Sequence, residues 1–118
     1  MSGQVRRVCQ TVQLQPDQLE RYLALHAAVW PSVEARLRAS NIRNYSIFRR
    51  NLTLVGYFEY VGDDLDADMA AIAADPETQR WWELTAPCQI DVEPDAPGGP
   101  WRDLDEVWHL ENRAAATP

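Results

Sequence analysis

A proline interrupts the strongest amphipathic pattern in the chain, and this interruption constrains the fold more than any other sequence feature. Apolar residues recur at steps of three and four along residues 19–37, which is the spacing of one helix face. Pro31 lies inside this pattern, has no N–H to donate and disfavours helical geometry at Trp30. We therefore predict one helix over about 16–29 and a second helix over about 31–39.

His26 is one of two histidines and falls inside this apolar stripe, shortly before the break. Tyr22 lies four residues before it and Trp30 four residues after it, so a helix would place all three side chains on one face. One interpretation is a core histidine whose hydrogen bonds are made by neighbouring residues. The other is a general acid/base in an aromatic pocket, because imidazole titrates near neutral pH. The dipole at the helix C-terminus would then favour the protonated imidazole.

The remaining periodicities predict the order β-α-β-β-α-β. Alternating side chains predict strands at residues 5–14, 42–49, 52–60 and 104–110. A short amphipathic helix is expected near 65–72, and Asp75-Pro76 is a typical start of the next helix. This order is that of a ferredoxin-like α+β fold with an antiparallel sheet.

We expect a single domain over residues 1–118. Its core spans 5–110, with a proline- and acid-rich loop at 87–100 and a frayed tail at 112–118. In the 42–49 strand, strict alternation would place Arg43 on the same face as Tyr45 and Ile47. Gly56 lies inside the 52–60 strand, where a glycine indicates a bulge or the close approach of another group.

Composition excludes several classes of partner. The 118 residues carry a formal net charge of −7, whereas nucleic-acid-binding domains usually have a basic footprint. No apolar run reaches the roughly 18 residues of a membrane span, and the N-terminus lacks the apolar segment of a signal peptide. We expect a soluble cytoplasmic protein that binds neither nucleic acid nor membrane.

Missing residue types also exclude most cofactor chemistry. All 11 basic residues are arginine, so Schiff-base, pyridoxal-phosphate and P-loop lysine chemistry are excluded. His26 and His109 form no metal-ligand grouping, and Cys9 and Cys88 are isolated from each other. We therefore expect no metal and no cofactor, with Cys9 buried and Cys88 a reduced thiol in a loop.

Trp81 and Trp82 are adjacent on a predicted helix and would point about 100° apart. Indoles suit an ordinary core or dimer interface, and equally the C–H face of a sugar ring. Together with His26, Tyr22 and Tyr45, they indicate acid/base chemistry on a small, neutral, polyhydroxylated ligand. A nucleotide or acyl thioester would find nothing to hold its charge.

The chain resembles the L-rhamnose mutarotase family from about residue 5 to residue 110. The motifs that carry the resemblance are weak singly but specific in this order and spacing. They are Gln15-Pro16-Asp17, E-R-Y-x-x-x-H at Glu20–His26, Val29-Trp30-Pro31, Asn44-Tyr45-x-Ile47, Gln79-Arg80-Trp81-Trp82 and Glu106-Val107. The departures are Ala27-Ala28 in place of the family's Asn-Pro, Phe48 where a tyrosine can occur, and a divergent loop at 87–100.

The resemblance implies a homodimeric ferredoxin-like barrel, the dimeric α/β barrel, with one sugar site per subunit and no cofactor. It implies that His26 is the proton donor. It also implies that the sugar is bound by Tyr22, Tyr45, Trp81 and Trp82.

As a hypothesis, His26 protonates the ring oxygen of L-rhamnose or a related deoxy sugar, which interconverts the α and β anomers. The preferred deoxy sugar and the base stay open, as does whether Glu59, Glu106 or His109 reaches the site. Two alternatives remain. One is a cofactorless monooxygenase of the same barrel class, and the other is a sugar-binding dimer without catalysis.

Overall fold

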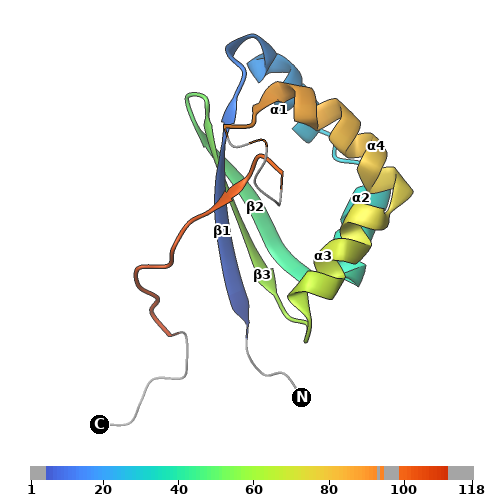
Figure 1. The fold of residues 1–118 in the computed structure, drawn as a ribbon, viewed down its shortest axis with the longest axis vertical. Helices are drawn as coiled ribbons and strands as arrows, with labels where there is room; N and C mark the ends of the chain where they lie inside the picture. Colours follow the sequence, from blue (N-terminus) through green and yellow to red (C-terminus); the bar gives the residue numbers. More distant parts are fainter. Residues whose placement is uncertain (1–4, 93, 95–98, 112–118) are drawn as a thin grey trace.

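One antiparallel sheet lies against a layer of helices in the computed structural model, which describes residues 5–92, 94 and 99–111 (Figure 1). The strands are β1 (Arg6–Leu14), β2 (Ile42–Arg50), β3 (Thr53–Tyr60), β4 (Gln89–Ile90) and β5 (Arg102–Asp103). The α-helices are α1 (Leu19–His26), α2 (Pro31–Ala39), α3 (Leu65–Ala74) and α4 (Pro76–Thr85). Short 3₁₀ turns at Pro16–Gln18 and Ala86–Cys88 precede α1 and follow α4.

The sheet has the strand order β2-β3-β1-β4, and β5 also pairs with β1. Every strand pairing is antiparallel. The predicted ferredoxin-like α+β class is therefore confirmed. All four helices lie on the same side of the sheet (Figure 1).

The helix-facing side of the sheet carries two separate clusters of buried side chains. The first consists of Val12, Leu14, Tyr22, Leu54 and Cys88. The second consists of Ile42, Phe58, Tyr60 and Ile72. Between them on the same face, Gln10 of β1 lies opposite Gly56 of β3. In β1 and β3 alternate side chains point to the helices, as the sequence predicts. This alternation accounts for both clusters and for the polar gap between them.

The break in the helical layer is confirmed, although α1 ends at His26 rather than near Val29. Trp30 adopts an extended conformation with φ −64° and ψ 133°, directly before α2 begins at Pro31. Its carbonyl then accepts hydrogen bonds from the backbone N–H groups of Val33 (3.0 Å) and Glu34 (3.2 Å). The proline thus ends one helix and starts the next.

Because of a bulge in β2, Arg43 does not lie on the sheet face that strict alternation predicted. Asn44 has a positive φ of 51°, and the β2–β3 register shifts between Arg43 and Ser46. Two β2 residues therefore oppose one β3 residue, which turns Arg43 to the face away from the helices. Tyr45 stays on the helix-facing side, where its ring lies 5.4 Å from that of Phe58.

The C-terminal region differs from the prediction in two respects. Gln89–Ile90 forms β4 inside the expected loop, and Cys88 is completely buried beside it instead of being a loop thiol. Of that loop, residues 93 and 95–98 lie outside the described residues, as does the tail at 112–118.

The strand predicted at 104–110 is wrong: within the described chain, strand pairing ends at β5. The Leu104 N–H still bonds the Cys9 carbonyl (2.8 Å), after which the chain leaves the sheet as an extended arm (Figure 1). Val107 is 97% exposed and Trp108 75% exposed on this arm. Among the described residues, no strand pairs with this alternating segment.

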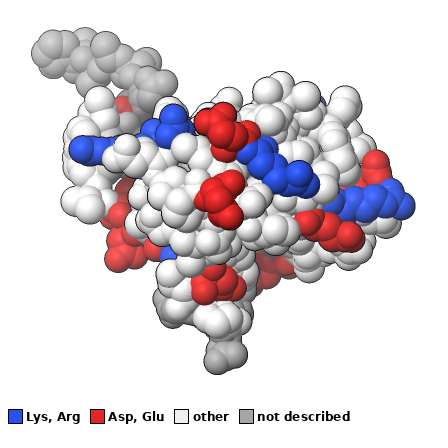
Figure 2. Space-filling view, turned by 90° about the horizontal axis from the view of Figure 1, so that it is seen from above, with Lys and Arg blue, Asp and Glu red and all other residues white. Residues whose placement is uncertain are grey.

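Charge is dispersed on the face seen in Figure 2, where arginines and acidic residues are interspersed among uncharged side chains. In the part of the chain that the structure describes, none of the helices has the length and apolar character of a membrane span.

We predict that Asp75→Ala destabilises the fold by about 1 kcal/mol, the usual value of a lost N-cap. The Asp75 carboxylate accepts from the backbone N–H (3.0 Å) and the hydroxyl (2.8 Å) of Thr78 at the start of α4. Urea unfolding measures the change. Asp66→Ala is the matched control, since this acid lies in the first turn of α3 without being its N-cap. Equal effects of the two substitutions would contradict the capping role.

Candidate functional site

The imidazole of His26 is held by aromatic rings from two helices. It stacks on Tyr22 with ring centroids 4.1 Å apart and meets the edge of Trp81 at 5.3 Å. Trp30 packs edge-on against the other side of Trp81, also at 5.3 Å. The end of α1, the start of α2 and the middle of α4 therefore converge on one aromatic cluster, which fixes the orientation of His26.

A backbone hydrogen bond determines which nitrogen of His26 can exchange a proton. Nδ1 lies 3.0 Å from the carbonyl oxygen of Tyr22. Because a carbonyl oxygen only accepts, Nδ1 carries a hydrogen and donates it. In the neutral ring, Nε2 therefore has the free lone pair and is the proton-exchanging atom.

Burial lowers the pKa of His26 below its ordinary value of 6.5, and the hydrogen bond to the Tyr22 carbonyl offsets this only in part. The prediction that the helix dipole favours the protonated imidazole is therefore wrong, since the pKa is lowered and not raised. Removing the charged ring from water is the largest cause of the shift. His26 is therefore mostly neutral at pH 7, and its protonated form is a stronger acid than a free imidazolium.

Two phenols stay protonated near this histidine. Burial raises the pKa of Tyr22, and the negative charge of an ionised Tyr45 would raise it further, while a hydrogen bond with the Gln89 side chain lowers it. Burial also raises the pKa of Tyr45, although 40% of this residue is exposed. Both phenols remain hydrogen-bond donors at neutral pH.

The predicted site residues do not all lie together. His26, Tyr22 and Trp81 form direct ring contacts, and Tyr45 lies within electrostatic reach of Tyr22. Trp82 instead is 44% exposed on α4. The two adjacent indoles therefore have different environments, as their helical offset predicts.

The sequence left open whether Glu59, Glu106 or His109 reaches the site. The two glutamates have hydrogen-bond partners away from His26. Glu59 accepts hydrogen bonds from Asn44 (2.8 Å) and Tyr57 (2.9 Å) on the sheet face away from the helices. Glu106 forms a two-pronged ion pair with Arg7, with distances of 2.8 and 2.9 Å. His109 lies on the exposed arm.

Two residues near the cluster were missed by sequence reasoning. The Gln89 side chain lies near enough to the Tyr22 phenol to lower its pKa, and Trp101 packs against the buried cluster that contains Tyr22. Trp101 also lies over Gly56, close to Tyr45. The only sequence signal for this contact is the glycine inside a strand, which indicates the close approach of a group but does not identify it.

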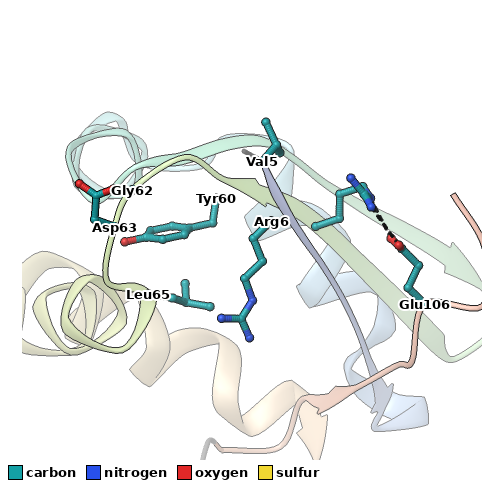
Figure 3. A pocket seen from close by; sticks show the side chains of 8 residues that line it. Val5, Arg6, Tyr60, Gly62, Asp63, Leu65 and Glu106 are labelled. Carbon is teal, nitrogen blue, oxygen red and sulfur yellow. Dashed lines mark hydrogen bonds and ion pairs between the residues drawn. The ribbon is translucent and has the colours of Figure 1, made fainter. Parts of the chain in front are cut away.

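An open depression lies at the end of the sheet where β1 starts and β3 ends (Figure 3). It is lined by residues of the β1 start and of the β3–α3 connection, with the Arg7–Glu106 ion pair at its side. The lining does not include His26. Among the described residues, no three His, Cys, Asp or Glu side chains gather to form a candidate metal site.

Comparison with known proteins identifies relatives over most of the chain. The sequence pattern of the L-rhamnose mutarotase family matches residues 7–110. An L-rhamnose mutarotase of Lactiplantibacillus plantarum is 32% identical over 105 residues, which are 89% of this chain and 98% of that protein. One from Opitutus terrae is 38% identical over 92 residues, covering 76% and 84% of the two chains.

Among solved structures, the L-rhamnose mutarotase FA22100 of Formosa agariphila superposes with a TM-score of 0.68. The match covers 90% of this chain and 99% of that one, at 24% sequence identity. It supports the same ferredoxin-like fold.

We predict that His26 titrates below pH 6.5 and is protonated on Nδ1 when neutral, because burial disfavours the charged ring and the Tyr22 carbonyl oxygen beside Nδ1 can only accept a hydrogen bond. The ¹⁵N and ¹³C shifts of the imidazole followed by NMR measure both properties. His109→Gln leaves His26 as the one histidine in the chain, so the signals need no further assignment. A titration at or above 6.5, or a proton on Nε2, would contradict this description of the site.

Proposed function

This chain belongs to the L-rhamnose mutarotase family and is an isomerase that interconverts sugar anomers, and we propose that His26 is the proton donor of this reaction. We also propose L-rhamnose, or a related deoxy sugar, as the substrate. The observation that carries the proposal is the orientation of His26. Its Nδ1 is occupied by the Tyr22 carbonyl, so Nε2 is the atom that can exchange a proton with a ligand.

Ring opening requires two proton transfers. In the proposed step, the His26 imidazolium gives its Nε2 proton to the ring oxygen while a second group takes the proton of the anomeric hydroxyl. The C1–O5 bond breaks and C1 becomes a carbonyl carbon. A phenol such as that of Tyr45, or a bound water, relays the second proton.

Ring closure reverses the same steps after rotation about the C1–C2 bond. Neutral His26 takes the proton from the O5 hydroxyl, the O5 atom attacks the other face of the carbonyl, and the relay returns its proton to O1. His26 is thus used in both protonation states within one cycle. A lowered pKa suits this double use, because the imidazolium donates readily and the neutral ring is easily regenerated.

The surrounding aromatics would bind the sugar without charge. We propose that Tyr22 and Tyr45 hydrogen-bond sugar hydroxyls and that Trp81 and Trp82 offer apolar surface to the ring. Their raised pKa values keep the two phenols protonated, so they can donate to hydroxyl oxygens. For Trp82, the indole on α4 is 44% exposed and is therefore accessible to a ligand.

The two alternatives are not favoured. A cofactorless monooxygenase and a sugar-binding dimer without catalysis would both fit the fold alone. Relatives that are 32% and 38% identical are named L-rhamnose mutarotases, which supports the isomerase instead.

We predict that His26→Gln slows the exchange between the L-rhamnose anomers by about 10²–10⁴-fold, the usual contribution of a general acid/base. Glutamine keeps hydrogen-bonding atoms at this position but does not titrate. Saturation-transfer NMR measures the exchange directly. His109→Gln is the same chemical change on the arm and should leave the rate unchanged.

The pH profile tests the direction of the transfer. Since the imidazolium is the donor, kcat/KM should rise as the pH falls from 8 and level off below the lowered pKa of His26. If His26→Gln exchanged the anomers as fast as the wild type, His26 would have no part in the mechanism. A rate that falls with falling pH would make His26 the base and contradict its role as donor.

We further propose that the protein is a homodimer, with a second copy covering the sheet face that carries no helices. Val107 and Trp108 on the arm are 97% and 75% exposed, and Phe48 is exposed on this sheet face. Exposed apolar groups of this size, together with an alternating strand pattern that pairs with no strand among the described residues, favour burial against another sheet.

The free thiols of Cys9 and Cys88 support a cytoplasmic location.

We predict that Phe48→Asp and Trp108→Asp each convert the dimer into a monomer, because a charge would have to be buried without a partner. Sedimentation velocity measures the mass against the 13.5 kDa of one chain. Met69→Asp places the same charge on an exposed position of α3 and should leave the dimer intact. A wild-type protein that sediments as a monomer would refute the proposal.

A further inference from the structure

The indole of Trp101 lies directly over the backbone of Gly56. A Cβ atom at residue 56 would be 3.2 Å from Cζ3 and 3.5 Å from Cη2 of this indole, and 3.6 Å from Cε1 of Tyr45. Two aromatic rings therefore converge on the glycine from the helix-facing side of the sheet. The missing side chain of Gly56 provides the space in which they lie.

Pairing with β1 fixes the position of Trp101. The two β5 residues that follow it, Arg102 and Asp103, pair with Thr11 and Gln10. The Gln10 side-chain amide donates to the Asp103 carboxylate at 2.8 Å. Arg102 also donates to the carbonyl of Trp101 itself at 2.9 Å. The indole is thus attached to the central strand of the sheet rather than to a free loop.

The neighbours of Trp101 connect it to the candidate site. It packs against the buried cluster that contains Tyr22 and Leu54, and its contact with Gly56 brings it beside Tyr45. Ile47 of β2 is the cross-strand partner of Gly56 and is exposed. Cross-strand partners share one face of the sheet. Trp101, Tyr45 and Ile47 therefore surround the glycine with an apolar surface next to the two phenols.

We propose that Trp101, lying on Gly56 between Tyr45 and Ile47, forms the apolar subsite that receives the C5 methyl group of a 6-deoxy sugar. This inference rests on the proposed mutarotase function and makes Trp101 a specificity-determining residue for it. A methyl group gains from burial against these side chains. A hydroxymethyl group at the same place would have to give up hydrogen bonds to water.

The expected discrimination is moderate. Apolar pockets separate substrates that differ by one methylene or one added hydroxyl by about 10–200-fold. L-Rhamnose and its 6-hydroxy counterpart L-mannose differ only in this group. We therefore expect wild-type kcat/KM for anomer exchange to be about 10–100-fold higher for L-rhamnose.

The experiment measures the ratio of the two kcat/KM values in variants that change this subsite in opposite directions. Trp101→Ala opens it and should bring the ratio close to one, whereas Trp101→Phe should retain part of the preference. In Gly56→Ala the added methyl group pushes the indole a few tenths of an ångström into the subsite, so the ratio should rise. The ratio does not depend on the fraction of folded enzyme, because both sugars are measured on the same sample.

Val92→Ala is the matched control, since Val92 lies exposed in the same β4–β5 connection. Its ratio should equal that of the wild type. An unchanged ratio in both Trp101 variants, or a wild type that does not distinguish the two sugars, would overturn the inference while the mutarotase function stands. If the wild type accelerates the exchange of neither sugar, the proposed function fails, and the inference fails with it.

Discussion

The site depends on the break between α1 and α2. A proline inside a helix costs about 3 kcal/mol, so the chain ends α1 before Pro31 instead of continuing through it. The turn places Trp30 in an extended conformation, where it packs on Trp81. Trp81 in turn makes a T-shaped contact with His26, the last residue of α1. One backbone constraint thus brings two helices and α4 together around the histidine.

Desolvation then decides the electrostatics of this cluster. For His26 it acts against the hydrogen bond to the Tyr22 carbonyl, and it is the larger of the two effects. The same burial raises the pKa values of Tyr22 and Tyr45. An imidazole that gives up its proton easily therefore lies among phenols that keep theirs. Such a separation of pKa values assigns acid/base work to the histidine and hydrogen bonding to the phenols.

The features that sequence predicts correctly are local ones. The alternation of β1, the break at Pro31 and the cap at Asp75 each depend on residues close together in the chain. The features that it missed depend on distant partners. The bulge at Asn44 is defined by its register against β3, and the burial of Cys88 by packing against residues far earlier in the sequence. The arm beyond β5 has a strand pattern, but no strand pairs with it in the part of the chain that the structure describes.

The gap between the two buried clusters explains why the sheet tolerates a glycine at its centre. A glycine inside a strand costs about 0.5–1 kcal/mol relative to alanine, and a divided core gives up some apolar burial. Both losses fall at Gly56, opposite Gln10, where Trp101 and Tyr45 approach the backbone. Trp101 also packs against the buried cluster that contains Tyr22, and burial of this large apolar side chain offsets part of these losses. The missing side chain of Gly56 therefore leaves room for two aromatic rings to lie on the sheet at this position.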